Sequence, residues 1–179
     1  EGQPLGLSIA FGGPYLGFMA ATQKMMRNLP GRIVGQTEDH NGKKGYVLTL
    51  QAREQHIRRE KASSNICSNQ ALCALAVGVY LATMGNEGIK KAATLSTSKA
   101  HYLSAELAKV EYQTENKGEF FHEFVTVSEV PAAKALAALE EKGILGGFPL
   151  DEHRILWCCT EVNTKEEMDA VVQILKEVQ

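Results

Sequence analysis

A run of cationic residues that leads into an apolar stretch constrains the fold of this chain more than any other feature. The cationic run, residues 53–67, carries four basic side chains and one imidazole, those of Arg53, His56, Arg58, Arg59 and Lys61. Near its end the run contains three polar residues, Ser63, Ser64 and Asn65. Beyond the run, residues 71–82 are apolar apart from one glycine. Ser and Asn are favoured N-cap residues, because their side-chain oxygens accept hydrogen bonds from the free N–H groups of the first turn. We therefore expect a helix to begin at residues 63–65.

The same run has the features of an anion site. The positive end of a helix attracts a phosphate or carboxylate, and a neighbouring guanidinium can add two parallel hydrogen bonds. A solvated charged surface is the alternative, because Glu54 and Glu60 can pair with Arg58 and Lys61 at helical spacing. Composition alone favours the solvated surface.

Bulk properties exclude several classes of protein. The 179 residues are 44% hydrophobic, which is enough to bury one core or two small ones. The chain has 19 Lys and Arg but 21 Asp and Glu, so its net charge is not positive and gives no general attraction for nucleic acid. The longest apolar run, residues 71–82, is too short to span a bilayer, and no signal peptide precedes it. We expect a cytoplasmic protein with no nucleic-acid or membrane partner.

The sequence offers no familiar metal or nucleophile motif. Its five histidines are scattered, and none forms a ligand pair at helical spacing, so we expect no metal. The four cysteines lack zinc-finger and redox spacing and are expected to be reduced, buried thiols: Cys67, Cys73, Cys158 and Cys159. The glycine-rich loop at Gly12, Gly13 and Pro14 lacks the Gly-Lys-Ser/Thr of a phosphate loop, so by itself it predicts only a turn.

The order of apolar patterns predicts two units. In residues 1–87 we expect a strand over 5–11, a helix over 16–26, a β-hairpin that turns at Asn41-Gly42, and a further helix. The small-residue stripe of this last helix predicts that it is internal or lies at a subunit interface. Residues 84–88 read as the boundary. The chain begins without an initiator methionine, in what reads as the interior of a domain, so we expect a fragment of a longer protein.

The second unit, residues 88–179, reads as α-β-β-α-β-α. We expect helices over residues 89–109, 131–142 and 164–178, and strands over 110–113, 119–127 and 154–159. Thr164 and Glu167 have the spacing of a capping box, and Gly143 that of a helix C-cap. This order predicts a small antiparallel sheet with helices on one side.

Four blocks of sequence resemble a known family. Residues 2–6 (GQPLG), 11–17 (FGGPYLG), 30–35 (PGRIVG) and 53–67 (REQHIRREKASSNIC) are similar to the P-protein of the glycine cleavage system, and most of all to subunit 1 (alpha) of its two-subunit bacterial form. The resemblance runs the whole length of the chain but covers only the C-terminal part of that subunit. The longest block is far more specific than any short motif.

The resemblance implies an α/β fold-type I pyridoxal-phosphate enzyme. Residues 1–87 would be the end of its large domain, and residues 88–179 its small C-terminal domain. The family decarboxylates glycine and transfers the aminomethyl group to the lipoyl arm of H-protein, with pyridoxal phosphate as electron sink. The implied assembly is a cytoplasmic heterotetramer with subunit 2 (beta), linked through glycine catabolism to T-protein and L-protein.

The resemblance also implies that the Schiff-base lysine is missing. In the beta subunit and in single-chain relatives, that lysine lies in a His-Lys-Thr motif shortly before a glycine-rich stretch ending in Gly-Pro. Counting back from Gly12-Gly13-Pro14 places Gln3 there, and no His-Lys pair occurs in the chain. A glutamine amide cannot form an aldimine, so pyridoxal phosphate is expected on the beta subunit. Lys61 has charged neighbours instead of a cofactor pocket, so we do not expect it to be catalytic.

Two interpretations of residues 53–67 and three of the function stay open. The run could lie at the alpha/beta interface. There its arginines would orient a carboxylate or line the entrance for an acidic carrier protein, and His56 would donate a hydrogen bond. The alternative is a solvated surface. Beside a catalytic-complex subunit, the chain could be a non-catalytic assembly or binding module with a ferredoxin-like C-terminal domain. A self-sufficient aminotransferase-like enzyme is the third hypothesis.

Overall fold

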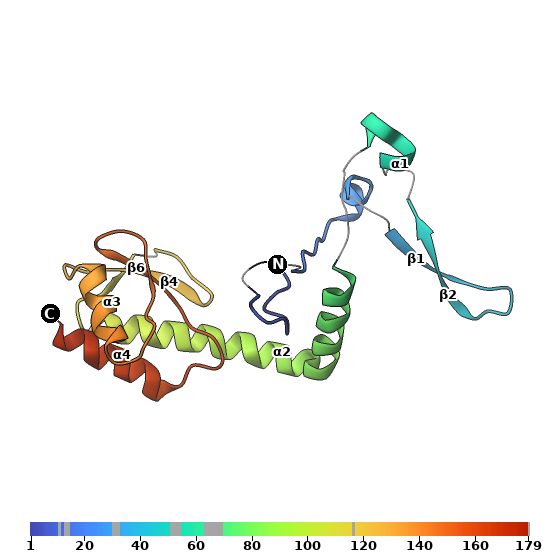
Figure 1. The fold of residues 1–179 in the computed structure, drawn as a ribbon. Coiled ribbons are helices and arrows are strands. Elements are labelled where there is room, and N and C mark those ends of the chain that lie inside the picture. The colour runs from blue at the N-terminus through green and yellow to red at the C-terminus, as the bar shows by residue number, and fades with distance from the viewer. Residues whose placement is uncertain are drawn as a thin grey trace. The chain divides into compact units, whose positions relative to one another are not determined.

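The protein divides into two compact units, Glu1–Thr83 and Met84–Gln179, which are described separately (Figure 1). The computed structural model describes residues 1–10, 12, 15–29, 33–50, 55–62, 70–115 and 117–178. One long helix, α2 (Ala71–Ala108), contributes to both units.

A four-stranded antiparallel sheet in the order β3-β4-β6-β5 organises the second unit. Its strands are β3 (Gln113–Thr114), β4 (Glu123–Val127), β5 (Phe148–Pro149) and β6 (Arg154–Cys158). Alternate residues of the central strands are buried, and Phe124 pairs with Trp157 while Thr126 pairs with Ile155. The Trp157 Nε1 donates a hydrogen bond to the buried Thr126 Oγ1 at 2.7 Å, so neither polar group is left unsatisfied.

Three helices supply the rest of this core. They are the second part of α2, α3 (Ala132–Glu140) and α4 (Lys165–Glu177) (Figure 1). Each helix contributes one completely buried leucine, respectively Leu107, Leu139 and Leu175. Their side chains belong to one apolar cluster with those of β4 and β6. The predicted antiparallel sheet and its flanking helices are thus confirmed, with β5 as an additional, two-residue strand.

Local signals place the ends of the helices as expected. The Thr164 side chain accepts from the Glu167 N–H at 3.2 Å, and the Glu167 carboxylate accepts from the Thr164 N–H at 2.8 Å. This capping box fixes the start of α4. Beyond α3, Gly143 adopts a φ of 76°, a left-handed conformation that favours glycine after a helix.

The predicted hairpin forms in the first unit. Strands β1 (Ile33–Glu38) and β2 (Lys44–Thr49) pair antiparallel across a turn that contains Gly42 at a φ of 75°. The Asp39 carboxylate accepts from the N–H groups of Asn41 and Lys43 at 2.8 and 2.9 Å. These bonds hold the turn and set the strand register.

Two expectations for the first unit are wrong. The described residues 1–10 form a turn and extended chain, and residues 15–22 are not helical; only a short 3-10 helix, η1 (Gln23–Asn28), follows. Leu5 and Leu7 alternate as in a strand, but such a pattern gives a strand only where a neighbour can take its hydrogen bonds. Here Leu5 and Leu7 donate instead to the carbonyls of Gly2 and Gln3, within a local turn.

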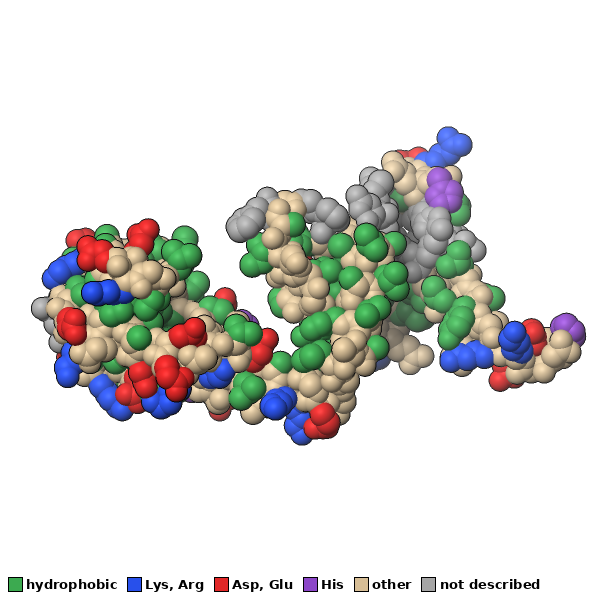
Figure 2. All heavy atoms as spheres, turned by 60° about the horizontal axis from the view of Figure 1, so that its bottom comes forward, with side chains coloured by type: hydrophobic (Ala, Val, Ile, Leu, Met, Phe, Trp, Pro, Cys, Tyr) green, Lys and Arg blue, Asp and Glu red, His purple; other side chains and the backbone are tan. Residues whose placement is uncertain are grey.

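Helix α2 is broken at Gly85, whose φ of 61° and ψ of −178° are not helical. In the part before this glycine, Leu72 is 77% and Leu75 64% exposed, so the described residues of the first unit do not bury these two side chains. Of the two predicted positions for this helix, inside the protein or at a subunit interface, the second stays a prediction. Figure 2 shows hydrophobic side chains gathered on the surface of this unit, whereas charges of both signs cover the second.

By length and hydropathy alone, α2 could cross a membrane, and only 6% of its most apolar 18-residue stretch is buried. The break at Gly85 weakens that interpretation. Residues 71–84 form a helix of roughly 21 Å, and a bilayer core is about 30 Å thick. A single helix of this kind is weak support for a membrane protein.

Candidate functional site

Gln3 is held in a compact turn at the start of the chain. Its side-chain Nε2 donates to the Leu7 carbonyl at 2.7 Å, and its carbonyl accepts from the Leu7 N–H at 3.1 Å. The turn packs on α2, because a Cβ added at Gly6, which has a φ of 88°, would lie 2.7 Å from the Tyr80 ring. The amide of Gln3 therefore has a local structural role.

A hydrogen bond joins the start of the chain to a residue just beyond the glycine-rich loop. The Gly2 N–H donates to the Leu16 carbonyl at 2.6 Å, which joins the two sides of the loop. Gly12 adopts a φ of 131°, a conformation that favours glycine. Gly13 and Pro14 lie outside the described residues. Among the described residues 1–10, 12 and 15–22 there is no lysine that could supply the amine that Gln3 lacks.

The cationic run is exposed where it is described. Helix α1 (Gln55–Arg58) carries His56 and Arg58, and the 3-10 helix η2 (Arg59–Lys61) carries Arg59 and Lys61. Arg59 has a φ of 53°, which is uncommon for a residue with a side chain. The predicted cap residues Ser63, Ser64 and Asn65 lie outside the described residues, as does Arg53. The anion site therefore stays a prediction.

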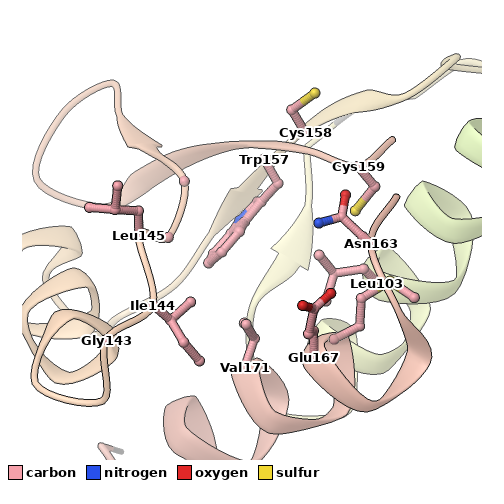
Figure 3. Close-up of a pocket in the computed structure, with 13 residues that line it drawn as sticks. Leu103, Gly143, Ile144, Leu145, Trp157, Cys158, Cys159, Asn163, Glu167 and Val171 are labelled. Atoms are coloured by element: carbon pink, nitrogen blue, oxygen red, sulfur yellow. The ribbon is translucent and has the colours of Figure 1, made fainter. Parts of the chain in front are cut away.

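A cavity of about 300 Å³ opens in the second unit between the loop after α3, the end of β6 and the start of α4 (Figure 3). Trp157, Ile144 and Val171 give it an apolar lining, and none of the lining residues is a lysine. A Cβ at Gly147 would lie 2.4 Å from the Leu156 carbonyl oxygen, so only glycine lets this loop approach β6 so closely. The cavity is a second candidate site.

The polar groups of the cavity already have partners. The Asn163 Oδ1 accepts from the Thr160 N–H at 2.8 Å, and Glu167 belongs to the capping box. The hydrogen bond from the Thr164 N–H holds the pKa of Glu167 below its ordinary value. Burial raises the pKa of the Cys159 thiol to about 11, so this thiol is neutral at pH 7. We find no activated nucleophile among the residues that line it.

The cysteine prediction holds only in part. Among the described cysteines, Cys159 is buried, Cys73 is half-buried and Cys158 is exposed. Successive residues of a strand point to opposite faces, so Cys158 and Cys159 cannot both face the core. In Figure 3 the Cys158 side chain points away from the cavity.

One cluster was missed by the sequence analysis. His122, Glu123 and Cys158 each bring a metal-ligand atom within 4.8 Å of the other two. Ligand spacing along a helix is visible in a sequence, whereas this cluster depends on the pairing of β4 with β6, in which Glu123 lies opposite Cys158. Only knowledge of the strand register could have revealed it.

Comparison with known proteins gives consistent results. The family model described as "Glycine cleavage system P-protein" matches residues 1–175. The probable glycine dehydrogenase (decarboxylating) subunit 1 of Moorella thermoacetica is 54% identical over 98% of this chain and 41% of its own length. That of Desulfitobacterium hafniense is 53% identical over 99% of this chain and 42% of its own length.

A solved structure agrees with both. The crystal structure of a glycine decarboxylase (P-protein) of the glycine cleavage system, in inhibitor-bound form, matches with a TM-score of 0.87 and 41% identity. The match covers 100% of this chain and 42% of the chain in that crystal structure. The chain thus spans about two fifths of the length of the relatives it matches.

Proposed function

Because the chain belongs to the glycine cleavage system P-protein family, we propose that it forms part of subunit 1 (alpha) of a glycine dehydrogenase (decarboxylating). The assembled enzyme would decarboxylate glycine and pass the aminomethyl group to the lipoyl group of H-protein. One observation carries this proposal: sequence and fold agree with a glycine decarboxylase across the entire chain, at 41% identity and a TM-score of 0.87. The assembly-module alternative has no comparable support.

In this proposal, the two units are parts of a fold-type I pyridoxal-phosphate enzyme. Residues 1–87 are the end of the large domain, and residues 88–179 are the small C-terminal domain. The antiparallel sheet and helices of the second unit support the latter assignment. The enzyme is a cytoplasmic heterotetramer that is linked to T-protein and L-protein only indirectly, through the pathway.

The residues of this chain do not fit covalent attachment of pyridoxal phosphate. Schiff-base formation needs an amine, and the lone pair of the Gln3 amide is delocalised into its carbonyl. The Gln3 Nε2 is also engaged with the Leu7 carbonyl at 2.7 Å. The cofactor and its lysine are therefore assigned to subunit 2 (beta), and this chain would contribute surfaces around that site.

Reconstitution tests the proposal. We expect full-length subunit 1 alone to release no carbon dioxide from carboxyl-labelled glycine in the presence of lipoylated H-protein, and release to appear when subunit 2 is added. Full activity of subunit 2 without subunit 1 would support the assembly-module alternative instead. Release by subunit 1 alone would support the self-sufficient enzyme.

The cationic run is proposed to act in the assembled enzyme. Arg58 and Arg59 are exposed and belong to a segment with His56 and Lys61, which gives a concentrated positive charge. We expect Arg58→Ala and Arg59→Ala to raise the KM for H-protein or glycine several-fold and to leave the melting temperature of subunit 1 within about 2 °C. Lys24→Ala, which removes an exposed cation elsewhere in the first unit, is the control. Parallel losses of activity and melting temperature would make the arginines structural.

A further inference from the structure

We propose that His122, Glu123 and Cys158 form a zinc site that clips the ends of strands β4 and β6 together on the solvent-facing side of the sheet. The three side chains each bring one ligand atom within 4.8 Å of the others. Glu123 lies directly opposite Cys158 in the ladder. The Cys159 N–H donates to the His122 carbonyl at 3.0 Å, which holds the backbone of His122 beside the end of β6.

The donor set selects the metal. A thiolate and an imidazole favour zinc over the hard cations Mg²⁺ and Ca²⁺, which prefer oxygen ligands. With three protein ligands, water would fill the fourth position of a tetrahedral zinc ion. Tetrahedral zinc with bonds of about 2.0–2.3 Å places its ligand atoms roughly 3.3–3.8 Å apart. Glu123 and Cys158 are both exposed, so rotation of their side chains can close the remaining distance.

A second observation concerns the same imidazole. The Nδ1 of His122 is inaccessible to water and has no hydrogen-bond partner in the described part of the chain. The Phe121 ring lies edge-on to the imidazole, with centroids 4.5 Å apart, and restricts its orientation. A desolvated ring nitrogen normally has a partner, and a metal ion supplies one.

The zinc site adjoins the cavity beside Trp157, because Cys158 belongs to both sets of residues. The Cys158 sulfur points away from that cavity (Figure 3), and neither His122 nor Glu123 lines it. The proposal is also independent of the enzyme activity assigned above, because it concerns only the second unit. Its predicted role is to stabilise the end of the β4–β6 ladder when metal is bound.

Cobalt titration tests the site. We expect the reduced, metal-free chain to bind one equivalent of Co²⁺, with visible d–d bands and a near-ultraviolet thiolate-to-cobalt charge-transfer band that Zn²⁺ abolishes. Cys158→Ser should remove the charge-transfer band and weaken Zn²⁺ binding by roughly 100-fold or more, because losing even an outer-shell partner costs about 10- to 100-fold. Cys73→Ser, which removes a half-buried thiol outside the cluster, should leave both unchanged.

Three results would overturn the proposal. They are the absence of a charge-transfer band at millimolar Co²⁺, its persistence in Cys158→Ser, or its loss in Cys73→Ser. Glu123→Gln provides a second decision that does not depend on the cysteine variants, since Glu123 is exposed and its replacement is nearly isosteric. It should weaken Zn²⁺ binding at least tenfold, and unchanged binding would contradict the site.

Discussion

Gln3 has an amide where the resemblance to P-proteins places a lysine amine in the catalytic subunit. The structure gives that amide a different role, since its Nε2 bonds to the Leu7 carbonyl within a turn of the same short segment. Under the proposed correspondence with the catalytic subunit, this one position would exchange covalent chemistry for a local hydrogen bond. At the scale of single residues, this exchange is the basis for assigning the cofactor to another chain.

Asp169 provides a test of a single ion pair in the second unit. Its carboxylate pairs with Lys165 and accepts from the Tyr102 hydroxyl, and these contacts hold its pKa below the ordinary value of 3.8. A pKa lowered by folding adds stability that is present above pH 3.8 and is lost as the pH falls through the folded-state pKa. Asp169→Asn should therefore lower the free energy of unfolding at pH 7 and flatten its decline below about pH 4.

Denaturant unfolding at pH 7 and pH 3 checks this prediction. Glu161→Gln, which removes an exposed carboxylate outside the pair, controls for the change in net charge. Equal acid sensitivity of the wild type and Asp169→Asn would show that the pair contributes nothing to stability.

The elements of the second unit depend on packing that is shared among helices and sheet. Leu139 of α3 is completely buried in the cluster that also contains residues of α2, α4 and β6. Leu139→Ala should lower the free energy of unfolding by about 2–5 kcal/mol, through lost apolar burial and the cavity left behind. Leu145 is 92% exposed, so Leu145→Ala should change it by less than about 0.5 kcal/mol. Similar values for the two variants would contradict this core.

Elements with local signals could be predicted from the sequence. The Asn41-Gly42 turn, the Thr164–Glu167 capping box and Gly143 each specify a neighbouring strand or helix through contacts a few residues apart. Two failures of prediction both concern short segments whose structure depends on distant partners. Residues 5–11 have a strand pattern but no neighbouring strand among the described residues, and β5 is only two residues long and ends in Pro149.

The candidate sites follow the same division. Gln3 and the cationic run were found because they lie in contiguous, distinctive text. The His122–Glu123–Cys158 cluster joins strands that are far apart in sequence, so it required the register of β4 and β6. The exposure of Cys158 could have been predicted from the sequence, because adjacent residues on a strand face opposite sides of the sheet.

At the scale of the whole molecule, the exposed apolar surface of the first unit is the outstanding feature. Leu72, Leu75 and Val79 of α2 are 77%, 64% and 59% exposed. A large contiguous apolar surface usually marks an interface. The chain spans about two fifths of the length of its relatives, and we expect this face to be covered in the assembled enzyme.

The central claim is that this chain has no amine that holds pyridoxal phosphate. Borohydride reduction of the purified two-subunit enzyme, loaded with stoichiometric cofactor and analysed by peptide mass spectrometry, tests it most directly. The account predicts a pyridoxyl adduct on one lysine of subunit 2 and none on the residues of this chain. A stoichiometric pyridoxyl adduct on any lysine of this chain, Lys61 included, would contradict it.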